Sequence, residues 1–269
     1  MVISKLKKEI ESIIGIHDAR LLITGLLSVS NTDYVINKEM DIAQPQAEEL
    51  ISKAKKIASG EPLQYVVGTT EFMSLEFKVE PGVLIPRPDT ETLVEAAINY
   101  IGDKNLRVLD IGSGSGCVAI SIAHYCKNAE VTSIDISPQA LAIAKDNREL
   151  NNAEVQFMLC DIMNDYPKGK FDVIVSNPPY IPTNDISELD TNVKDFEPLT
   201  ALDGGKDGLD FYRRIISIAP ELLSDDGKIY FEVGHDQADA VAELMSKDFK
   251  NIKKIKDLCG IERVVCGQI

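Results

Sequence analysis

The chain has 269 residues, of which 44% are hydrophobic and 26% charged, and its formal net charge is −15. This length suits one large domain or one domain with a small companion, and the composition is typical of a globular protein. No apolar run approaches the roughly 18 residues that a membrane span requires, and the acid-containing N-terminal stretch lacks the cleavage site of a signal peptide. We therefore expect a cytoplasmic protein that is not associated with a membrane.

The negative charge is unevenly distributed. Residues 1–75 contain 8 Lys or Arg against 10 Asp or Glu, whereas residues 76–269 contain 20 against 33. A protein that grips duplex DNA or bare RNA usually has a basic face, because neutralising phosphates supplies most of the nonspecific affinity. We expect no stable nucleic-acid binding.

The cysteines and histidines form no recognisable metal-binding pattern. There is no CxxC, no HExxH and no His/Cys pair, so we predict no metal site and no disulfide framework. We expect the thiols to be buried or neutral. These residues are Cys117, Cys126, Cys160, Cys259, Cys266, His17, His124 and His235.

The first part of the chain is predicted to be helical. Apolar residues recur at helical spacing over residues 3–13 and 18–28, and a third helix is expected over residues 46–60, ending on Gly60. Residues 61–86 then alternate apolar and polar side chains around a Pro81-Gly82 turn, which predicts a small β-hairpin between two domains. We therefore divide the chain into a helical substrate-recognition domain (1–61), a hairpin linker (62–86) and a second domain (87–269).

From Asp89 onward, strands and helices alternate. We predict a helix over 89–101 capped by Asp89 or Thr90, and a later helix capped by Ser137. Such alternation of apolar strands with helices indicates an α/β fold, a seven-stranded, mostly parallel sheet covered on both faces. The predicted strands are 107–111, 131–135, 155–159, 172–176 and 227–233, with a terminal antiparallel pair at 251–258 and 262–267, and the other helices are 117–126 and 137–150.

A glycine-rich turn follows the first of these strands, in "VLDIGSGSGCVAIS". Gly112, Gly114 and Gly116 allow positive φ and a close approach of the backbone to a ligand. The dinucleotide fingerprint G-x-G-x-x-G fails because Cys117 stands at its last position, which disfavours a dehydrogenase. The spacing G-x-G-x-G after Asp110 is the form found in S-adenosylmethionine methyltransferases.

Two acids end the next two strands, where ligands of parallel sheets bind. Asp135 is placed to accept hydrogen bonds from both ribose hydroxyls of a nucleoside. Asp161 is placed to accept the adenine amino group, with Ile162 packing on the base. Three such features on consecutive strands predict a nucleoside site.

The fourth strand ends in "SNPPYIP", residues 176–182. An amide nitrogen is a poor nucleophile, and acceptors at the Asn177 side chain and the Pro178 carbonyl would hold both of its protons. They would also favour the positive charge that grows on nitrogen during methyl transfer. Pro179 stiffens this loop, and we expect Tyr180 to offer a flat face to a planar target. This arrangement predicts methyl transfer to an amino or amide nitrogen.

The chain resembles the peptide chain release factor glutamine methyltransferases, the PrmC/HemK family, nearly from end to end. The pieces that carry the resemblance are "DARLL", "GEPLQYVVG", "PGVLIPRPDTETLVE", "VLDIGSGSG", "SNPPYIP" and "EPLTALDGGKDGLDFYRRI". The glycine turn and NPPY alone would also fit amino-methyltransferases of DNA, which lack "GEPLQY", "IPRPDTE" and "EPLTALDGGKDGL".

The resemblance implies a Rossmann-like class I methyltransferase domain that transfers a methyl group from S-adenosylmethionine to the glutamine of the Gly-Gly-Gln motif in class I release factors. It implies that the helical domain recognises the release factor, and we expect a monomer. Some relatives carry an aromatic residue where this chain has Ile162. The catalytic and substrate-binding residues are predicted to be Asn177, Pro178, Pro179 and Tyr180, and the cofactor-binding residues Asp110, Gly112, Ser113, Gly114, Ser115, Gly116, Asp135, Asp161, Ile162 and Asn177.

Several alternatives stay open from the sequence. The target is alternatively a glutamine of a ribosomal protein, or an amino group of nucleic acid. Arg87, Asp89 and Glu91 either line the cofactor entrance or, for the two acids, cap a helix. Residues Gly204–Gly208 are either a mobile loop over the substrate or an ordinary surface turn.

Overall fold

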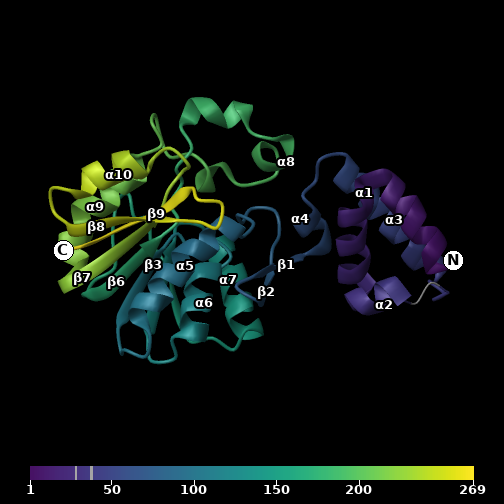
Figure 1. Cartoon of the computed structure of the whole chain (residues 1–269), viewed down its shortest axis with the longest axis horizontal. Coiled ribbons are helices and arrows are strands. Elements are labelled where there is room, and N and C mark those ends of the chain that lie inside the picture. Colours follow the sequence, from purple (N-terminus) through teal and green to yellow (C-terminus); the bar gives the residue numbers. More distant parts are fainter. Residues whose placement is uncertain (28, 37–38) are drawn as a thin grey trace.

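The computed structural model describes residues 1–27, 29–36 and 39–269. A small helical lobe at the N-terminus and a larger α/β lobe are joined by a short hairpin (Figure 1). Over the described ranges, no helix is both long and apolar enough to cross a membrane.

The small lobe consists of α1 (Ile3–Leu27), α2 (Asn31–Ile36) and α3 (Gln44–Ala58). The helices predicted at 3–13 and 18–28 form one element with an irregular residue between them, Gly15, whose φ is +82°. Position 28 lies outside the described residues. Leu6, Ile10, Leu22 and Leu50 are among the buried side chains that give this lobe a core of its own.

The connection between the lobes differs in part from the sequence prediction. The hairpin is present as β1 (Thr69–Phe72) and β2 (Leu75–Lys78), paired antiparallel. The stretch before it forms a short helix, α4 (Leu63–Val67), where alternating apolar residues indicated a strand. Pro62 stands at the start of α4 and Gly68, with φ +89°, ends it. The residues that begin and end this helix therefore determine its structure more strongly than the weak alternation of apolar and polar side chains does.

The larger lobe is built on a seven-stranded sheet with the order β5-β4-β3-β6-β7-β9-β8. β9 runs antiparallel to β7 and β8, and the other neighbouring strands are parallel to one another. The strands are β3 (Arg107–Ile111), β4 (Glu130–Asp135), β5 (Val155–Leu159), β6 (Phe171–Ser176), β7 (Leu223–Glu232), β8 (Lys250–Lys256) and β9 (Glu262–Gln268).

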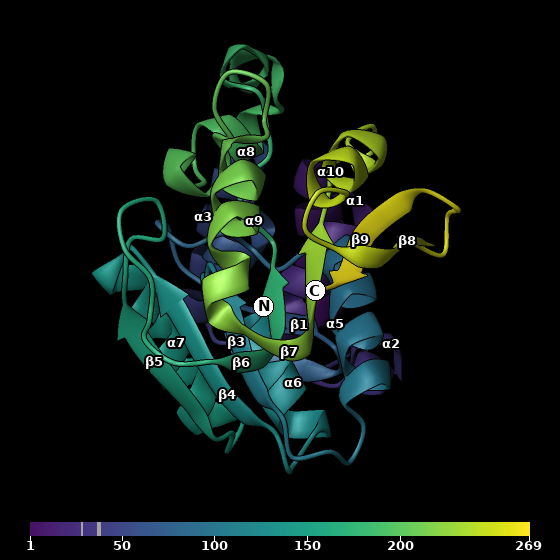
Figure 2. The ribbon, with the colours of Figure 1, turned by 90° about the vertical axis from the view of Figure 1, so that its left-hand side faces the viewer.

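Helices cover both faces of this sheet (Figure 2). Side chains of successive strand residues point to opposite faces, so Val108 joins one core cluster and Leu109 the other. The first cluster packs against α5 and α6, and the second against α9 and α10. The helices are α5 (Pro88–Ile101), α6 (Cys117–Tyr125), α7 (Pro138–Leu150), α9 (Asp210–Leu222) and α10 (Ala238–Met245).

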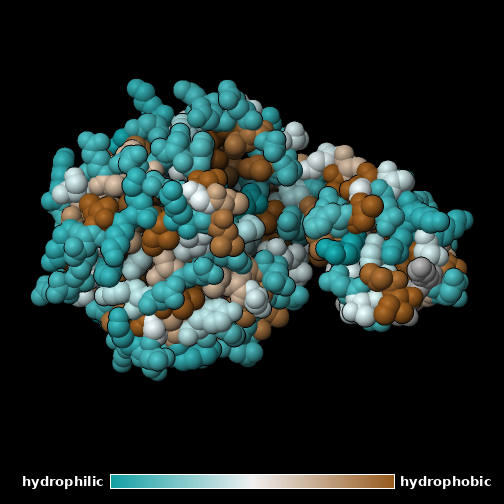
Figure 3. Space-filling model, in the orientation of Figure 1, coloured by the Kyte–Doolittle hydropathy of each residue, from teal (hydrophilic) through white to brown (hydrophobic). Residues whose placement is uncertain are grey.

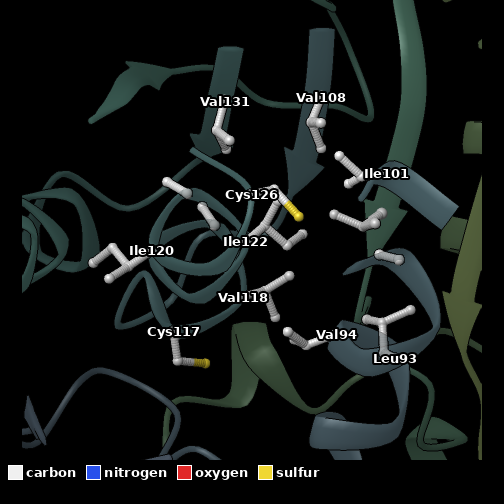
Figure 4. Close-up of a cluster of buried hydrophobic side chains, with 14 of the residues drawn as sticks. Leu93, Val94, Ile101, Val108, Cys117, Val118, Ile120, Ile122, Cys126 and Val131 are labelled. Carbon is white, nitrogen blue, oxygen red and sulfur yellow. The ribbon is translucent and has the colours of Figure 1, made fainter. Parts of the chain in front are cut away.

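Three of the five thiols, those of Cys117, Cys126 and Cys266, belong to the first core cluster. Figure 4 shows Cys117 and Cys126 among aliphatic side chains of α5, α6 and the sheet. Burial is the largest cause that raises the pKa of both thiols, to about 12 for Cys117. Both therefore act as small apolar packing residues rather than as nucleophiles.

We propose the division at 1–61, 62–86 and 87–269 as the domain organisation. The separate core of the small lobe supports it. However, Leu63, Val66 and Val67 of α4 pack against that core, while Tyr65 packs with Val79 and Ile85 on the other side. The linker therefore belongs physically to both lobes and couples them.

Candidate active site

A cavity of about 480 Å³ lies at the carboxyl ends of the central strands. The ends of β3, β4, β5 and β6 all contribute to its wall, as expected for a ligand site in a parallel sheet. In the space-filling view, apolar side chains gather in a hollow in the upper part of the larger lobe (Figure 3). The lining residues predicted from the sequence are Gly112, Gly114, Asp135, Asp161, Ile162, Asn177, Pro178 and Pro179.

The glycine turn adopts the positive φ angles that the sequence predicts. Gly112, Gly114 and Gly116 all have positive φ, at +94°, +52° and +84°. A Cβ at Gly114 would meet nothing within 4 Å, so the turn leaves open space on the cavity side. At Gly116 a Cβ would lie 3.1 Å from the Ala144 side chain, so this glycine serves helix packing instead.

Asp135 faces the cavity from the end of β4. Its carboxylate accepts hydrogen bonds from the backbone N–H groups of Gly114 and Ser137, both at 2.8 Å. Burial is the largest cause acting on its pKa and raises it, while these hydrogen bonds lower it. The two backbone donors fix the direction of the carboxylate and leave each oxygen a second lone pair for ligand hydroxyls.

Asp161 and Ile162 follow β5 and also line the cavity. The Asp161 carboxylate accepts hydrogen bonds from the Met163 backbone at 3.0 Å and from the Asn164 side chain at 2.6 Å. Ile162 is 7% exposed, and it offers an aliphatic surface where a planar base would lie.

Asp110, Ser113 and Ser115 are buried beneath the turn rather than along the cavity wall. Ser133 donates to Asp110 at 2.6 Å, while the other Asp110 oxygen, Oδ1, has no hydrogen-bond partner. Burial raises the pKa of Asp110 to about 7. A cationic ammonium group bound at the turn would supply a partner of opposite charge.

These residues fit S-adenosylmethionine. The cavity combines two carboxylates, exposed backbone of a glycine turn and an aliphatic wall, and a buried acid lies beneath the turn; these features suit a ribose, an adenine and a cationic amino acid part.

The sequence matches known proteins over both lobes. Residues 5–68 match the family described as PrmC N-terminal domain, and residues 88–192 match Methyltransferase small domain. A release factor glutamine methyltransferase of Clostridium acetobutylicum is 40% identical over 264 residues, which are 96% of this chain and 93% of that protein. The chain belongs to the release factor glutamine methyltransferase family.

Solved structures support the fold of this family member. A methyltransferase from Pyrococcus furiosus superposes with a TM-score of 0.56 at 20% identity, over 84% of this chain and 98% of that one. A 16S rRNA N2 G1207 methyltransferase from T. thermophilus, in complex with AdoMet and guanosine, superposes with a TM-score of 0.54 at 18% identity, over 74% and 49%. The predicted Rossmann-like methyltransferase fold is confirmed.

Asn177 and Pro178 reach the cavity from the end of β6. The Asn177 side chain donates through Nδ2 to the Thr90 hydroxyl at 3.1 Å. Pro178 is buried and Pro179 lines the same cavity. The loop therefore presents the end of one carboxamide to a rigid, largely apolar cavity.

Tyr180 does not line the cavity; its ring lies beside Gly234. Burial is the largest cause that raises the pKa of its hydroxyl, to about 12. The backbone carbonyl of Tyr180 accepts a hydrogen bond from the Gln237 side chain at 2.8 Å. In this geometry Tyr180 anchors the loop, and a stacking role against the target stays a prediction.

Two glycines of the 204–208 segment, Gly204 and Gly208, pack directly against this loop. A Cβ at Gly204 would lie 2.8 Å from the Pro179 carbonyl oxygen, and a Cβ at Gly208 would lie 2.2 Å from the Tyr180 carbonyl oxygen. The Gly204 N–H also donates to the Ile181 carbonyl at 2.9 Å. These glycines permit close backbone packing, which neither a mobile loop nor a simple surface turn would require.

The segment around Arg87 holds the site together rather than capping a helix. The residue preceding α5 is Arg87, and no side chain caps this end, so the prediction that Asp89 or Thr90 is the cap is wrong. Asp89 forms an ion pair with Arg263 at 2.8 Å, and Glu91 accepts the Met73 N–H at 2.7 Å. Both side chains therefore interact with residues that are distant in the sequence instead of capping the helix.

Arg87 pairs with Glu197, whose side chain is almost fully buried. The residues just after Glu197, from Pro198 to Ala201, line the cavity. The ion pair therefore attaches one wall of the cavity to the start of α5. No local sequence signal marks Glu197, because its partner is 110 positions away.

The sequence analysis also missed Glu232. It ends β7 and is 2% exposed, beside the end of β6 that carries Asn177. The rule that selected Asp135, an acid at the carboxyl end of a buried strand, would have selected Glu232 as well.

Proposed function

We propose that this protein methylates the side-chain amide nitrogen of the Gly-Gly-Gln glutamine in class I peptide chain release factors. The observation that carries the proposal is the Asn177 carboxamide at the wall of a nucleoside-sized cavity, in a chain 40% identical over nearly its full length to release factor glutamine methyltransferases. S-adenosylmethionine is the methyl donor, in keeping with the methyltransferase family and fold.

The residues that hold the cofactor are those of the cavity wall. Asp135 binds the ribose hydroxyls, Asp161 and Ile162 bind the adenine, and the turn from Gly112 to Gly116 approaches the amino acid part. Ser113 and Ser115 support this turn from below, and Asp110, buried beneath it, favours the ammonium group through its charge. When bound, the cofactor supplies a methyl group on a sulfonium, whose departure leaves a neutral thioether.

The protein's contribution to the reaction is position and charge. Asn177 Oδ1 and the Pro178 carbonyl accept the two hydrogens of the target amide and stabilise the positive charge that develops on its nitrogen. Holding the nitrogen in line with the methyl group contributes roughly 7–11 kcal/mol to lowering the barrier, by analogy with oriented intramolecular reactions. One amide proton is then released to water, so no general base is required.

The small lobe and the wall from Pro198 to Ala201 are proposed to receive the release factor. The small lobe is joined to the larger lobe by α4 and the hairpin, next to the Arg87–Glu197 pair and Phe196. We propose that the enzyme acts as a monomer, in the cytoplasm, on a protein and without stable binding to nucleic acid. The acidic surface of residues 76–269 supports the last point.

The test is mass spectrometry of an unmethylated class I release factor after incubation with the protein and S-adenosylmethionine. We expect one added methyl group on the Gly-Gly-Gln glutamine, and its loss with Asn177→Ala. No methylation of the release factor, with cofactor still bound, would overturn the proposed substrate. Methylation of ribosomal protein or RNA in parallel reactions would then identify the alternative target.

A further inference from the structure

A buried carboxylate lies directly behind the Asn177 side chain. Ser176 of β6 is paired with Phe231 of β7, so the next residues, Asn177 and Glu232, emerge side by side from the sheet. Glu232 is 2% exposed; burial is the largest cause acting on its pKa and raises it, while the side chains of Thr90 and Asn177 lower it. Its Oε2 has no hydrogen-bond partner.

Burying an acid without a paired cation is unfavourable. Arg263, whose positive charge lowers the Glu232 pKa, forms its ion pairs with Asp89 at 2.8 Å and with Asp257 at 3.1 Å. An apolar residue at the end of β7 would pack there at lower cost. The position of Glu232 therefore calls for a role in the chemistry beside it.

The surroundings of Asn177 distinguish the two ends of its carboxamide. An ionised carboxylate can only accept hydrogen bonds, so Glu232 attracts the NH₂ end of Asn177 and repels the oxygen end. Thr90 Oγ1 accepts from the same Nδ2 at 3.1 Å. With Nδ2 bonded to Thr90 and with Glu232 emerging beside Asn177, Oδ1 is the end that is left for the cavity.

We propose that Glu232 is a positioning residue that, together with Thr90, holds the Asn177 carboxamide with Oδ1 toward the target amide. The inference rests on the proposed function, because an acceptor is needed there only if the target carries N–H groups. With the opposite orientation, Asn177 would present donors to a donor, and the target nitrogen would lose its hydrogen bond as charge develops on it.

The orientation should depend on the charge of Glu232. The pKa of Glu232 is raised to about 7, with burial as the largest cause; Asp89 on α5 also raises the pKa, whereas Arg263 on β9 lowers it. A protonated carboxyl has an O–H group that can donate to Asn177 Oδ1. The carboxamide can then turn Oδ1 toward Glu232 and its NH₂ group toward the target. The other titratable groups in this surrounding are Tyr180 in the loop, Tyr212 on α9 and Cys117 on α6. All three have raised pKa values and stay neutral near pH 7.

The first experiment compares wild type with Glu232→Gln in release factor methylation between pH 5.5 and 8.5. For wild type we expect kcat to rise with pH through a midpoint near 7. For the variant we expect kcat about 10–100-fold lower at pH 8, with no such rise, and with the KM for the release factor and the Kd for S-adenosylmethionine changed less than about threefold. This range corresponds to about 1.4–2.8 kcal/mol of transition-state stabilisation.

Two further variants make the comparison specific. Thr90→Val removes the second partner of Nδ2, and we expect a smaller loss of kcat with the pH-dependent rise retained. Glu221→Gln is the matched control, since Glu221 is an exposed residue of α9 that bonds to Tyr166. We expect wild-type kcat and pH dependence for it. A flat wild-type profile, or a Glu232→Gln enzyme with wild-type kcat, would overturn the proposal.

A measurement without substrate separates this inference from the proposed function. In ¹⁵N-labelled protein, the Asn177 side-chain NH₂ resonances should shift with pH around 7 in wild type and should not in Glu232→Gln. If the Asn177 NH₂ chemical shifts are identical in wild type and variant at every pH, the positioning role is overturned. If the NH₂ signals titrate as expected but no release factor is methylated, the proposed function fails and the positioning of Asn177 stands.

Discussion

Gly208 offers the sharpest test of how the Asn177–Tyr180 loop is held. Its φ is +73°, and a Cβ placed on it would lie 2.2 Å from the Tyr180 carbonyl oxygen and 2.6 Å from Gln237 Nε2. The carbonyl belongs to the backbone, so the Gly208→Ala variant must displace the loop itself. Gln237 would at the same time lose its 2.8 Å hydrogen bond to that carbonyl.

Three contributions set the expected loss of stability. A non-glycine residue in a left-handed conformation costs roughly 1–2 kcal/mol. Overpacking of a tight site costs typically about 1–3 kcal/mol. A lost buried hydrogen bond costs about 1 kcal/mol. We therefore expect the free energy of unfolding to fall by about 3–6 kcal/mol in Gly208→Ala.

The matched control is Gly260→Ala. Gly260 has a similar φ of +83°, but a Cβ there would meet nothing within 4 Å. We expect it to lose only the backbone contribution, about 1–2 kcal/mol. Urea unfolding monitored by circular dichroism gives both values.

The two variants should differ more in kcat than in their free energy of unfolding. A shift of about 1 Å in a group that positions the target can cost about 100-fold in rate. We expect such a loss in kcat for Gly208→Ala at a temperature where the variant is folded, and wild-type kcat for Gly260→Ala. If the two variants unfold at the same urea concentration and methylate at the same rate, the packing of Gly208 against Tyr180 does not support the loop.

Three further predictions concern charged residues. Arg87→Ala should reduce the free energy of unfolding by about 2–4 kcal/mol, because Glu197 is left buried without its cation, and adding Glu197→Gln should restore part of it in a double-mutant cycle. Asp135→Asn should weaken S-adenosylmethionine binding in calorimetry about 10–150-fold, since a charged acceptor is lost. The unfolding free energy of ligand-free protein should decrease from about pH 4.5 to 7, and less so in Glu232→Gln.

The sign of the pH prediction follows from the direction of the shift. The Glu232 pKa is raised in the folded protein, from 4.5 to about 7, so between these values the folded state binds more protons than the unfolded state. Stability is then lost as pH rises, by up to about 3 kcal/mol for this group. If the free energy of unfolding rises with pH over this range, the buried, uncompensated state of Glu232 is contradicted.

A double-mutant cycle without coupling would contradict the Arg87 prediction. Wild-type affinity for S-adenosylmethionine in Asp135→Asn would contradict the Asp135 prediction.

Local patterns were sufficient to predict the frame of the larger lobe. Apolar strands alternating with helices indicated the parallel sheet, and the antiparallel end was predicted from the last two strands. The Ser137 cap was also predicted, and its side chain accepts the Ala140 N–H. These features depend on residues close together in the sequence, where propensity and periodicity apply directly.

The same patterns failed where distant contacts compete with local ones. Asp89 looks like a helix cap but pairs with Arg263, because the antiparallel strand β9 runs past the start of α5. The glycines at 204 and 208 suggested mobility or a turn, whereas their backbone packs on residues 179–181. No local signal distinguishes a glycine that moves from one that is needed for close packing.

The sequence by itself therefore determined the methyltransferase fold and the residues at the strand ends that form the cavity. It did so because the carboxyl ends of parallel strands meet at one edge whatever the details of packing. Only the tertiary structure placed Glu232 behind Asn177 and Arg87 against Glu197. Those contacts depend on strand order and on how a long connection folds back, which bring together residues separated by 55 and 110 positions.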